Sequence, residues 1–169
     1  LHSFPTRRSS DLRGVKTKVE PTLQEAPGVY NDTILAGLDY LLMEMGKRKM
    51  LAVLYLNNSW EWSGGYGYYL EQAGLGLAPR PNEDGYPAFM NFVAKYAACE
   101  KAHQLFYDYV RFILTRTNRY TKKKYKDDPA IMSWQIGNEP RAFSKEQLPA
   151  FEKWLGEASK LIRSLDKNH

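Results

Sequence analysis

The chain contains the sequence Asp128-Pro129-Ala130-Ile131-Met132-Ser133-Trp134-Gln135-Ile136-Gly137-Asn138-Glu139-Pro140-Arg141, an apolar run of strand length that stops abruptly in Asn-Glu-Pro-Arg. A second apolar run, from Met50 to Leu56, is too short for a helix and shows no polar alternation. Continuous apolar runs of this kind are typical of parallel strands that are buried on both faces. We therefore expect two buried parallel strands, with Glu139 placed where the second one ends.

Helical periods alternate with these strands. Apolar residues recur at helical spacing in segments 31–46, 87–96, 102–113 and 148–165. Asn31 or Asp32 is the expected cap of the first helix, and the last helix is expected to start near Leu148, which places Pro149 in its first turn. The order helix, strand, helix, strand, helix is typical of βαβ units and predicts a parallel sheet.

Three segments lack a clear period. Residues 15–30 are punctuated by Pro and Gly and are expected to form a loop. Residues 57–85 are rich in Gly and aromatic residues, and loops of this length inside compact domains are usually functional or disordered. Residues 1–12 (LHSFPTRRSSDL) have no apolar core of a signal peptide. We assign residues 1–13 to a non-native or disordered segment, and residues 14–169 to the domain itself.

Composition argues against several classes of protein. The net charge of +5 is partly local, because the first thirteen residues hold three arginines and one aspartate. The basic run Lys122 to Lys124 is followed by Asp127 and Asp128, as in a solvated loop, so no nucleic-acid partner is expected. A single Cys99 excludes an internal disulfide, and the three histidines share no metal-ligand spacing with it. No stretch is long and apolar enough to span a membrane.

Two motifs together resemble the β-mannanase branch of glycoside hydrolase family 5. The segment Asp128–Arg141 is similar to the family's fourth-strand signature, and the loop Asn57-Asn58-Ser59-Trp60-Glu61-Trp62-Ser63-Gly64-Gly65 follows the first apolar run. The resemblance covers about Lys16 to His169 and implies a (β/α)₈ barrel. Such a barrel needs about 250 residues, whereas this chain has 169. The expected fold class is therefore α/β, a partial (β/α)₈ TIM barrel covering about strands 3–4 and helices 2–4.

The resemblance also implies roles for residues of the Asn-Glu-Pro-Arg segment. In that family the Glu of this motif is the general acid/base, which assigns the role to Glu139. Asn138 is implied to bind the sugar 2-hydroxyl, and Arg141 to lie on the aglycone side of the cleft. Hydrolysis with retention needs a second carboxylate as nucleophile, and the family's nucleophile, on the seventh strand, is absent from this chain. No metal and no cofactor is expected.

The loop after the first strand should face the same side as Glu139, because the carboxyl ends of parallel barrel strands meet at one edge. Pyranose rings dock their flat C–H faces on aromatic rings. The candidate sugar-binding residues of this loop are Asn57, Trp60, Trp62 and Tyr66. Gly64 and Gly65 permit a tight turn, and Glu61 is expected to be solvated.

The resulting interpretation is a retaining endo-β-1,4-mannanase that acts on mannan, galactomannan or glucomannan when intact. The family resemblance implies a monomer that is secreted, periplasmic or attached to the cell surface. The chain as printed is expected to be inactive, because no glycosyl-enzyme forms without the second carboxylate.

Three alternatives remain open at this point. A β-1,4-glucanase (cellulase) of the same family is one, since a fold does not fix the sugar. A non-catalytic carbohydrate-binding fragment that keeps the aromatic loop is another. The third is a basic nucleic-acid binder, whose binding would fall steeply with salt.

Overall fold

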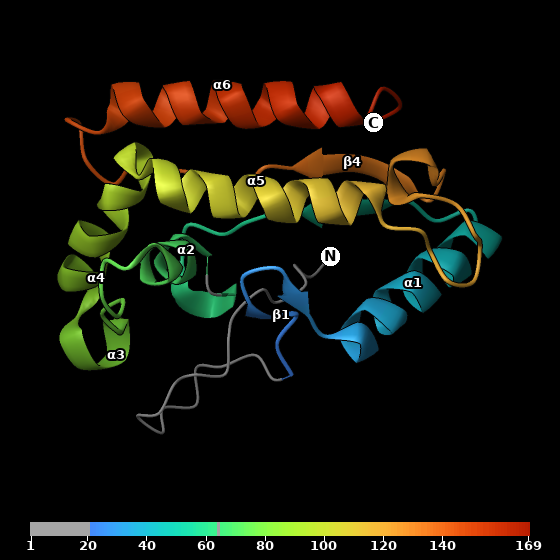
Figure 1. Cartoon of the computed structure of the whole chain (residues 1–169), viewed down its shortest axis with the longest axis horizontal. Coiled ribbons are helices and arrows are strands. Elements are labelled where there is room, and N and C mark those ends of the chain that lie inside the picture. Colours follow the sequence, from blue (N-terminus) through green and yellow to red (C-terminus); the bar gives the residue numbers. More distant parts are fainter. Residues whose placement is uncertain (1–20, 64) are drawn as a thin grey trace.

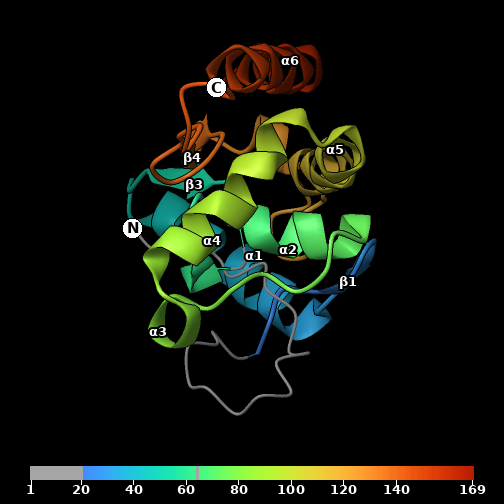
Figure 2. The same ribbon diagram turned by 90° about the vertical axis from the view of Figure 1, so that its left-hand side faces the viewer.

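The structure is a computed structural model and describes residues 21–63 and 65–169. The expectations for residues 1–13 and for Gly64 lie outside this part of the chain. Figures 1 and 2 place α6 along one side of the molecule, α5 and the β3–β4 pair in the middle, and α1, α2 and β1 on the other side. The elements in chain order are β1 (Gln24–Ala26), β2 (Val29–Tyr30), α1 (Asp32–Lys47), β3 (Ala52–Tyr55), η1 (Glu61–Ser63), α2 (Gly65–Ala73), α3 (Pro81–Asp84), α4 (Tyr86–Val93), η2 (Ala94–Ala98), α5 (Glu100–Thr115), η3 (Tyr125–Asp127), β4 (Ile131–Gln135) and α6 (Leu148–Leu165).

Strands β3 and β4 form the parallel pair that the sequence predicts. The register joins Ala52 to Ile131 at one end and Tyr55 to Gln135 at the other. Between β3 and β4 the chain passes through α2, α4 and α5, so the two parallel strands are joined by a helical crossover, as in a βαβ unit. Within the described residues this sheet has two strands and does not close a barrel, which is consistent with the partial barrel that the sequence predicts.

The prediction that both strands are buried on both faces is wrong for the described residues. Ala52 and Leu54 are buried in β3, but Leu51 just before it and Met132 in β4 are exposed. A two-stranded sheet leaves these side chains in contact with solvent, because none of the described elements covers them. The apolar run has the residue types of a strand that is buried on both faces, although none of the described elements packs against one of these faces.

Helices α1 and α6 begin where the sequence predicts. The side chain of Asn31 caps α1 by accepting hydrogen bonds from the backbone N–H groups of Thr33 (3.0 Å) and Ile34 (3.1 Å). Helix α6 starts at Leu148, with Pro149 in its first turn. Its apolar face, which includes Phe151 and Trp154, is buried against the neighbouring α5 and η2.

Two segments expected to be loops contain regular structure. Residues 57–85 hold η1, α2 and α3, and α2 is buried at nearly every position from Gly65 to Ala73. A helix that is buried all round has no polar face, so it lacks the amphipathic period on which the prediction depended. Residues 24–30 form the antiparallel hairpin of β1 and β2, whose strands of three and two residues are too short to show alternation.

Aromatic side chains make up the centre of the core. Tyr66 of α2 stacks on Tyr96 of η2, with ring centroids 4.2 Å apart, and Trp154 of α6 meets both rings edge-on at 5.7 and 5.0 Å. Burial raises the pKa of both tyrosines well above its usual value. Much of the high aromatic content thus joins α2, η2 and α6 rather than forming a ligand surface.

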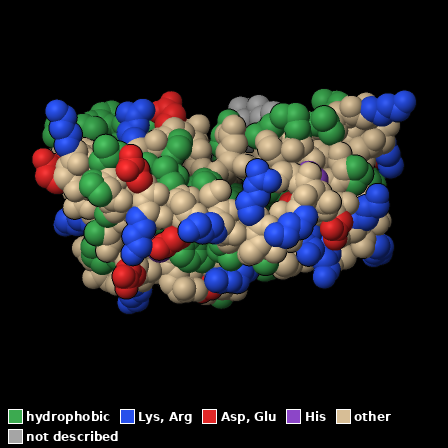
Figure 3. Space-filling view, turned by 90° about the horizontal axis from the view of Figure 1, so that it is seen from above, with side chains coloured by type: hydrophobic (Ala, Val, Ile, Leu, Met, Phe, Trp, Pro, Cys, Tyr) green, Lys and Arg blue, Asp and Glu red, His purple; other side chains and the backbone are tan. Residues whose placement is uncertain are grey.

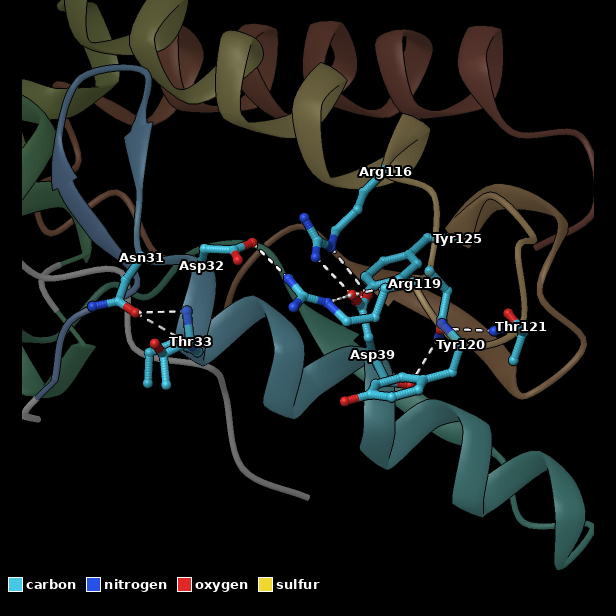
Figure 4. Close-up of polar contacts among 11 residues, drawn as sticks. Asn31, Asp32, Thr33, Asp39, Arg116, Arg119, Tyr120, Thr121 and Tyr125 are labelled. Carbon is cyan, nitrogen blue, oxygen red and sulfur yellow. Dashed lines mark hydrogen bonds and ion pairs between the residues drawn. The ribbon is translucent and has the colours of Figure 1, made fainter.

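A buried carboxylate fastens α1 to the segment that leads into β4 (Figure 4). Asp39 is 0% exposed and accepts hydrogen bonds from Arg116 through Nε (3.0 Å) and Nη2 (2.6 Å) and from the Tyr125 hydroxyl (2.6 Å). The backbone N–H and Nε of Arg119 add two longer contacts of 3.3 Å. Burial alone would raise the pKa of the Asp39 carboxyl, but the bonds from Arg116 and Tyr125 hold it below its usual value. We call these four residues the Asp39 cluster.

The outer surface over α6 mixes charges of both signs. On the face seen in Figure 3, Lys and Arg side chains lie among Asp and Glu side chains instead of forming a stripe of one sign. Lys122, Lys123 and Lys124 are exposed, which confirms the solvated loop that the sequence predicts. None of the helices in the described part of the chain is long and apolar enough to cross a membrane.

Candidate active site

The candidate site lies where β3 and β4 end, and main-chain hydrogen bonds continue the sheet into it. The N–H of Asn138 donates to the carbonyl of Asn57 (2.9 Å), and the N–H of Ser59 donates to the carbonyl of Asn138 (3.2 Å). Asn58 and Asn138 form a parallel bridge beyond the strands. The two segments that the sequence placed at one edge are therefore joined there, as predicted.

Glu139 has a left-handed backbone, with a φ of 46°. Only a few per cent of non-glycine residues have a positive φ. The hydroxyl of Ser59 donates to the carbonyl oxygen of Glu139 at 2.6 Å, which holds the segment in place. Backbone strain of this kind persists only where the surroundings impose it, and it clusters at active sites.

The Glu139 side chain meets two of the other predicted residues. The indole N–H of Trp60 donates to Oε2 at 2.7 Å, and Nη2 of Arg141 contacts the same oxygen at 3.3 Å. The side chain of Glu139 is 53% exposed, so its carboxyl group is open to a ligand from solvent. The guanidinium of Arg141 also lies over the Trp60 ring, 5.0 Å from its centroid. Glu139, Arg141 and Trp60 thus form one contact group.

Further aromatic residues surround Trp60. Phe89 stacks on it nearly parallel, at a centroid distance of 6.3 Å, while Tyr86 and Phe143 meet it edge-on at 5.9 and 5.4 Å. The Trp62 ring lies 6.1 Å from Trp60, and this residue is 51% exposed. Of the two tryptophans in the loop, Trp62 offers the more open surface to a ligand.

Two predicted sugar contacts lie in the interior. Tyr66 is 1% exposed and stacks on Tyr96 in the core, because it belongs to α2 and not to a surface loop. Asn57 is also buried, and its side-chain amide donates to the Tyr96 hydroxyl at 3.3 Å. Both residues contact Tyr96 in the interior, and their burial does not fit the prediction that they contact a sugar.

The turn after β3 depends on Asn58 and Gly65. The Asn58 side chain accepts from the backbone N–H of Trp60 (2.9 Å) and donates to the hydroxyl of Ser63 (3.0 Å). Gly65 has a φ of 51°, and a Cβ at this position would collide with the carbonyl oxygen of Asn58. Glycine is therefore required at Gly65 for the close approach of the two segments.

Three features of the site were not predictable from the sequence motifs. Ser59 lies inside the quoted loop motif, but nothing in the sequence shows that its hydroxyl binds residue 139. Tyr86 and Phe143 approach Trp60 from segments that carry no motif. Glu61, which we expected to be solvated, is buried and accepts a hydrogen bond from the Tyr86 hydroxyl at 3.4 Å. The charge of Glu61 is the main cause of a raised pKa at Tyr86.

The described residues contain no group of three or more His, Cys, Asp or Glu side chains that could hold a metal ion. At the edge of β4 the Glu139 carboxyl group has an arginine and an indole N–H beside it. Such a group can give or take a proton at a bound ligand.

Comparisons with known proteins point to a single family. The model of a family described as glycoside hydrolase family 5 β-mannosidase-like matches residues 8–169. Mannan endo-1,4-β-mannosidase 4 of Solanum lycopersicum is 35% identical over 147 residues, which cover 87% of this chain and 34% of that protein. Mannan endo-1,4-β-mannosidase 7 of Arabidopsis thaliana is 33% identical over 147 residues, covering 87% and 32%.

Solved structures agree with these relatives. A glycoside hydrolase family 5 mannosidase from Rhizomucor miehei superimposes with a TM-score of 0.80 at 35% identity, over 90% of this chain and 37% of that one. An endo-β-1,4-mannanase from Thermotoga petrophila has the same fold, with a TM-score of 0.72 at 24% identity, over 87% of this chain and 30% of that one. The chain spans about a third of the length of the curated relatives it matches.

Proposed function

Since the chain belongs to the glycoside hydrolase family 5 β-mannosidase-like family, we propose that the whole protein hydrolyses internal β-1,4-mannosidic linkages in mannan, galactomannan or glucomannan. The observation that carries the proposal is the half-exposed Glu139 carboxyl at the end of β4, held by Trp60 and Arg141 on a left-handed backbone. Relatives named mannan endo-1,4-β-mannosidase support β-mannan as the substrate.

In this proposal Glu139 is the general acid/base. It protonates the glycosidic oxygen as the bond to the sugar carbon breaks, and later takes a proton from the water that releases the product. A retaining mechanism needs a nucleophilic carboxylate about 5–5.5 Å away. We assign no residue of this chain to that role.

Three side chains are proposed to contact the substrate. Arg141, which is half-exposed, would form charge-assisted hydrogen bonds with hydroxyl groups on the aglycone side. Asn138 would bind the 2-hydroxyl of the sugar beside Glu139. The exposed ring of Trp62 would stack on a pyranose face farther from the bond that breaks.

The proposal extends to the setting of the reaction. We propose that the reaction takes place outside the cytoplasm, because a polysaccharide substrate is too large to cross a membrane by itself. A single barrel would supply both carboxylates, so the protein is proposed to act as a monomer.

The test uses the protein expressed from its complete gene, assayed on galactomannan, mannohexaose and cellohexaose. We expect release of manno-oligosaccharides with the β-configuration retained, as followed by NMR. Glu139→Gln should abolish this activity, while Glu152→Gln, a matched change at an exposed position on α6, should leave it unchanged. Mannan hydrolysis that survives Glu139→Gln, or that inverts the configuration, would contradict the proposal. Activity on cellohexaose alone would favour a β-1,4-glucanase instead.

A further inference from the structure

We propose that Trp60 is a positioning residue for Glu139 and is not a sugar platform, and that Oε1 of Glu139 is the oxygen that carries the transferred proton. This inference rests on the proposed role of Glu139. It gives different tasks to the two tryptophans of one loop, which the sequence had grouped together as stacking residues.

A short hydrogen bond joins the Trp60 side chain to Glu139. The indole N–H of Trp60 donates to Oε2 of Glu139 at 2.7 Å, a short distance for an N–H···O bond. The main chain at Trp60 is held by its N–H, which donates to the Asn58 side chain at 2.9 Å, and the indole ring packs against Phe89 and Phe143. A half-exposed glutamate would otherwise sample several rotamers, so a fixed donor restricts its carboxyl group to one orientation.

The surroundings of the Trp60 ring leave little room for a sugar. A sugar needs an open aromatic face, but the buried Phe89 stacks against this ring and the guanidinium of Arg141 lies over it. Phe143 contacts it edge-on at 5.4 Å. A pyranose would have to displace Arg141 to reach Trp60, whereas the exposed ring of Trp62 is free of such a cation in the described part of the chain.

The two carboxyl oxygens of Glu139 have different hydrogen-bond partners. Trp60 and Arg141 both donate to Oε2 of Glu139, and no donor to Oε1 occurs among residues 21–63 and 65–169. A proton on Oε2 would point at two N–H donors and repel them, because Oε2 accepts hydrogen bonds from both Trp60 and Arg141. We therefore assign the proton of the acid form to Oε1. In the proposed reaction the Oε1–H bond breaks and an O–H bond forms on the leaving sugar. The second carboxylate supplies the electron pair that displaces this sugar from the anomeric carbon.

The kinetic test compares Trp60→Phe with Trp62→Phe and Trp62→Ala in the protein from the complete gene. Trp60→Phe keeps an aromatic ring but removes the N–H donor, so kcat on mannohexaose should fall about 10-fold or more, with KM little changed. Aryl β-mannosides with activated leaving groups need less protonation and should lose less. Trp62→Ala should instead raise KM, and Trp62→Phe should restore it. Equal losses for Trp60→Phe on both substrate types, or a rise in KM alone, would overturn the inference.

A second measurement does not depend on catalysis. In ¹⁵N-labelled protein Glu139→Gln should shift the indole N–H resonance of Trp60, because the substitution changes the acceptor of its hydrogen bond. The indole resonance of Trp62 serves as the internal control and should stay unchanged. If the Trp60 resonance does not respond to Glu139→Gln, the positioning role is wrong. If it responds while mannan is not hydrolysed, the hydrogen bond stands and the proposed function fails.

Discussion

Asp39 and Glu139 are two carboxylates with the same types of partner and opposite surroundings. Each is bound by arginine and by one aromatic donor, with two arginines at Asp39 and one at Glu139, but Asp39 is fully buried while the Glu139 side chain is 53% exposed. Both oxygens of Asp39 accept hydrogen bonds, whereas the two donors to Glu139 share a single oxygen. A structural carboxylate is therefore buried and has hydrogen bonds to both of its oxygens. A carboxylate that exchanges a proton with a ligand is exposed and keeps one oxygen available.

The largest effect should come from the Asp39 cluster. Asp39→Ala leaves the largely buried guanidinium of Arg116 without its partner, and breaking a buried ion pair in this way costs about 3–5 kcal/mol. Urea unfolding at pH 7 of the protein from the complete gene measures this loss. Glu152→Ala on α6, an exposed position, should change the free energy of unfolding by less than about 0.5 kcal/mol. A loss below about 1 kcal/mol for Asp39→Ala would show that the cluster is not a structural clamp.

The next effect appears in catalysis instead of stability. Glu139→Ala should slow mannan hydrolysis by at least about 10²-fold, the lower range for loss of a general acid, which corresponds to about 2.7 kcal/mol. Aryl mannosides with activated leaving groups should suffer less in the first step, because they depart without protonation. Urea unfolding should show a change within about 1 kcal/mol, since exposed ion pairs contribute little. A similar loss with both substrates would argue against the acid role.

Asp39 should also make the stability of the protein depend on pH. The pKa of Asp39 is lowered in the folded protein, so its contribution is present above the unfolded value of about 3.9 and is lost as the pH falls through the folded value. The difference in unfolding free energy between the natural protein and Asp39→Asn should therefore shrink below about pH 4. Urea titrations between pH 2.5 and 7 measure it. A difference that stays constant over this range would rule out a titrating Asp39.

The smallest effect has the opposite sign. Glu139 adopts a left-handed backbone, which costs a residue with a side chain about 1–2 kcal/mol, and glycine avoids this cost while losing about 0.5–1 kcal/mol in chain entropy. Glu139→Gly should therefore leave stability unchanged or raise it by up to about 1 kcal/mol, with catalysis lost. Thermal unfolding at neutral pH measures the change. A clear drop in Tm would mean that Glu139 also supports the fold.

Local patterns predicted the elements that position the site. The apolar runs gave both parallel strands and the edge at which Glu139 and Trp60 meet, because the carboxyl ends of parallel strands share one edge. Asn31 marked the start of α1, since a side-chain acceptor is needed there for the free N–H groups. These features depend on residues that are near in sequence or follow a fixed period.

Long-range contacts were not predictable in this way. Asp39 and Arg116 are 77 residues apart, and each is typical of a solvated surface when taken alone. The burial of Tyr66 arises from packing against η2 and α6, which the residues around it do not show. The burial of Glu61 was not predictable either, because it depends on the contact with Tyr86, which lies 25 residues away.

The joint between Asn57, Ser59 and Asn138 has a consequence for protein engineering. Its hydrogen bonds run between main-chain atoms, so they do not depend on which side chains the loop carries. Only the Ser59 hydroxyl, which binds the carbonyl of Glu139, requires a particular residue type. Loops grafted from related enzymes that keep Trp60 and Gly65 should therefore leave Glu139 in place, and libraries that vary position 62 can change sugar preference separately from the acid.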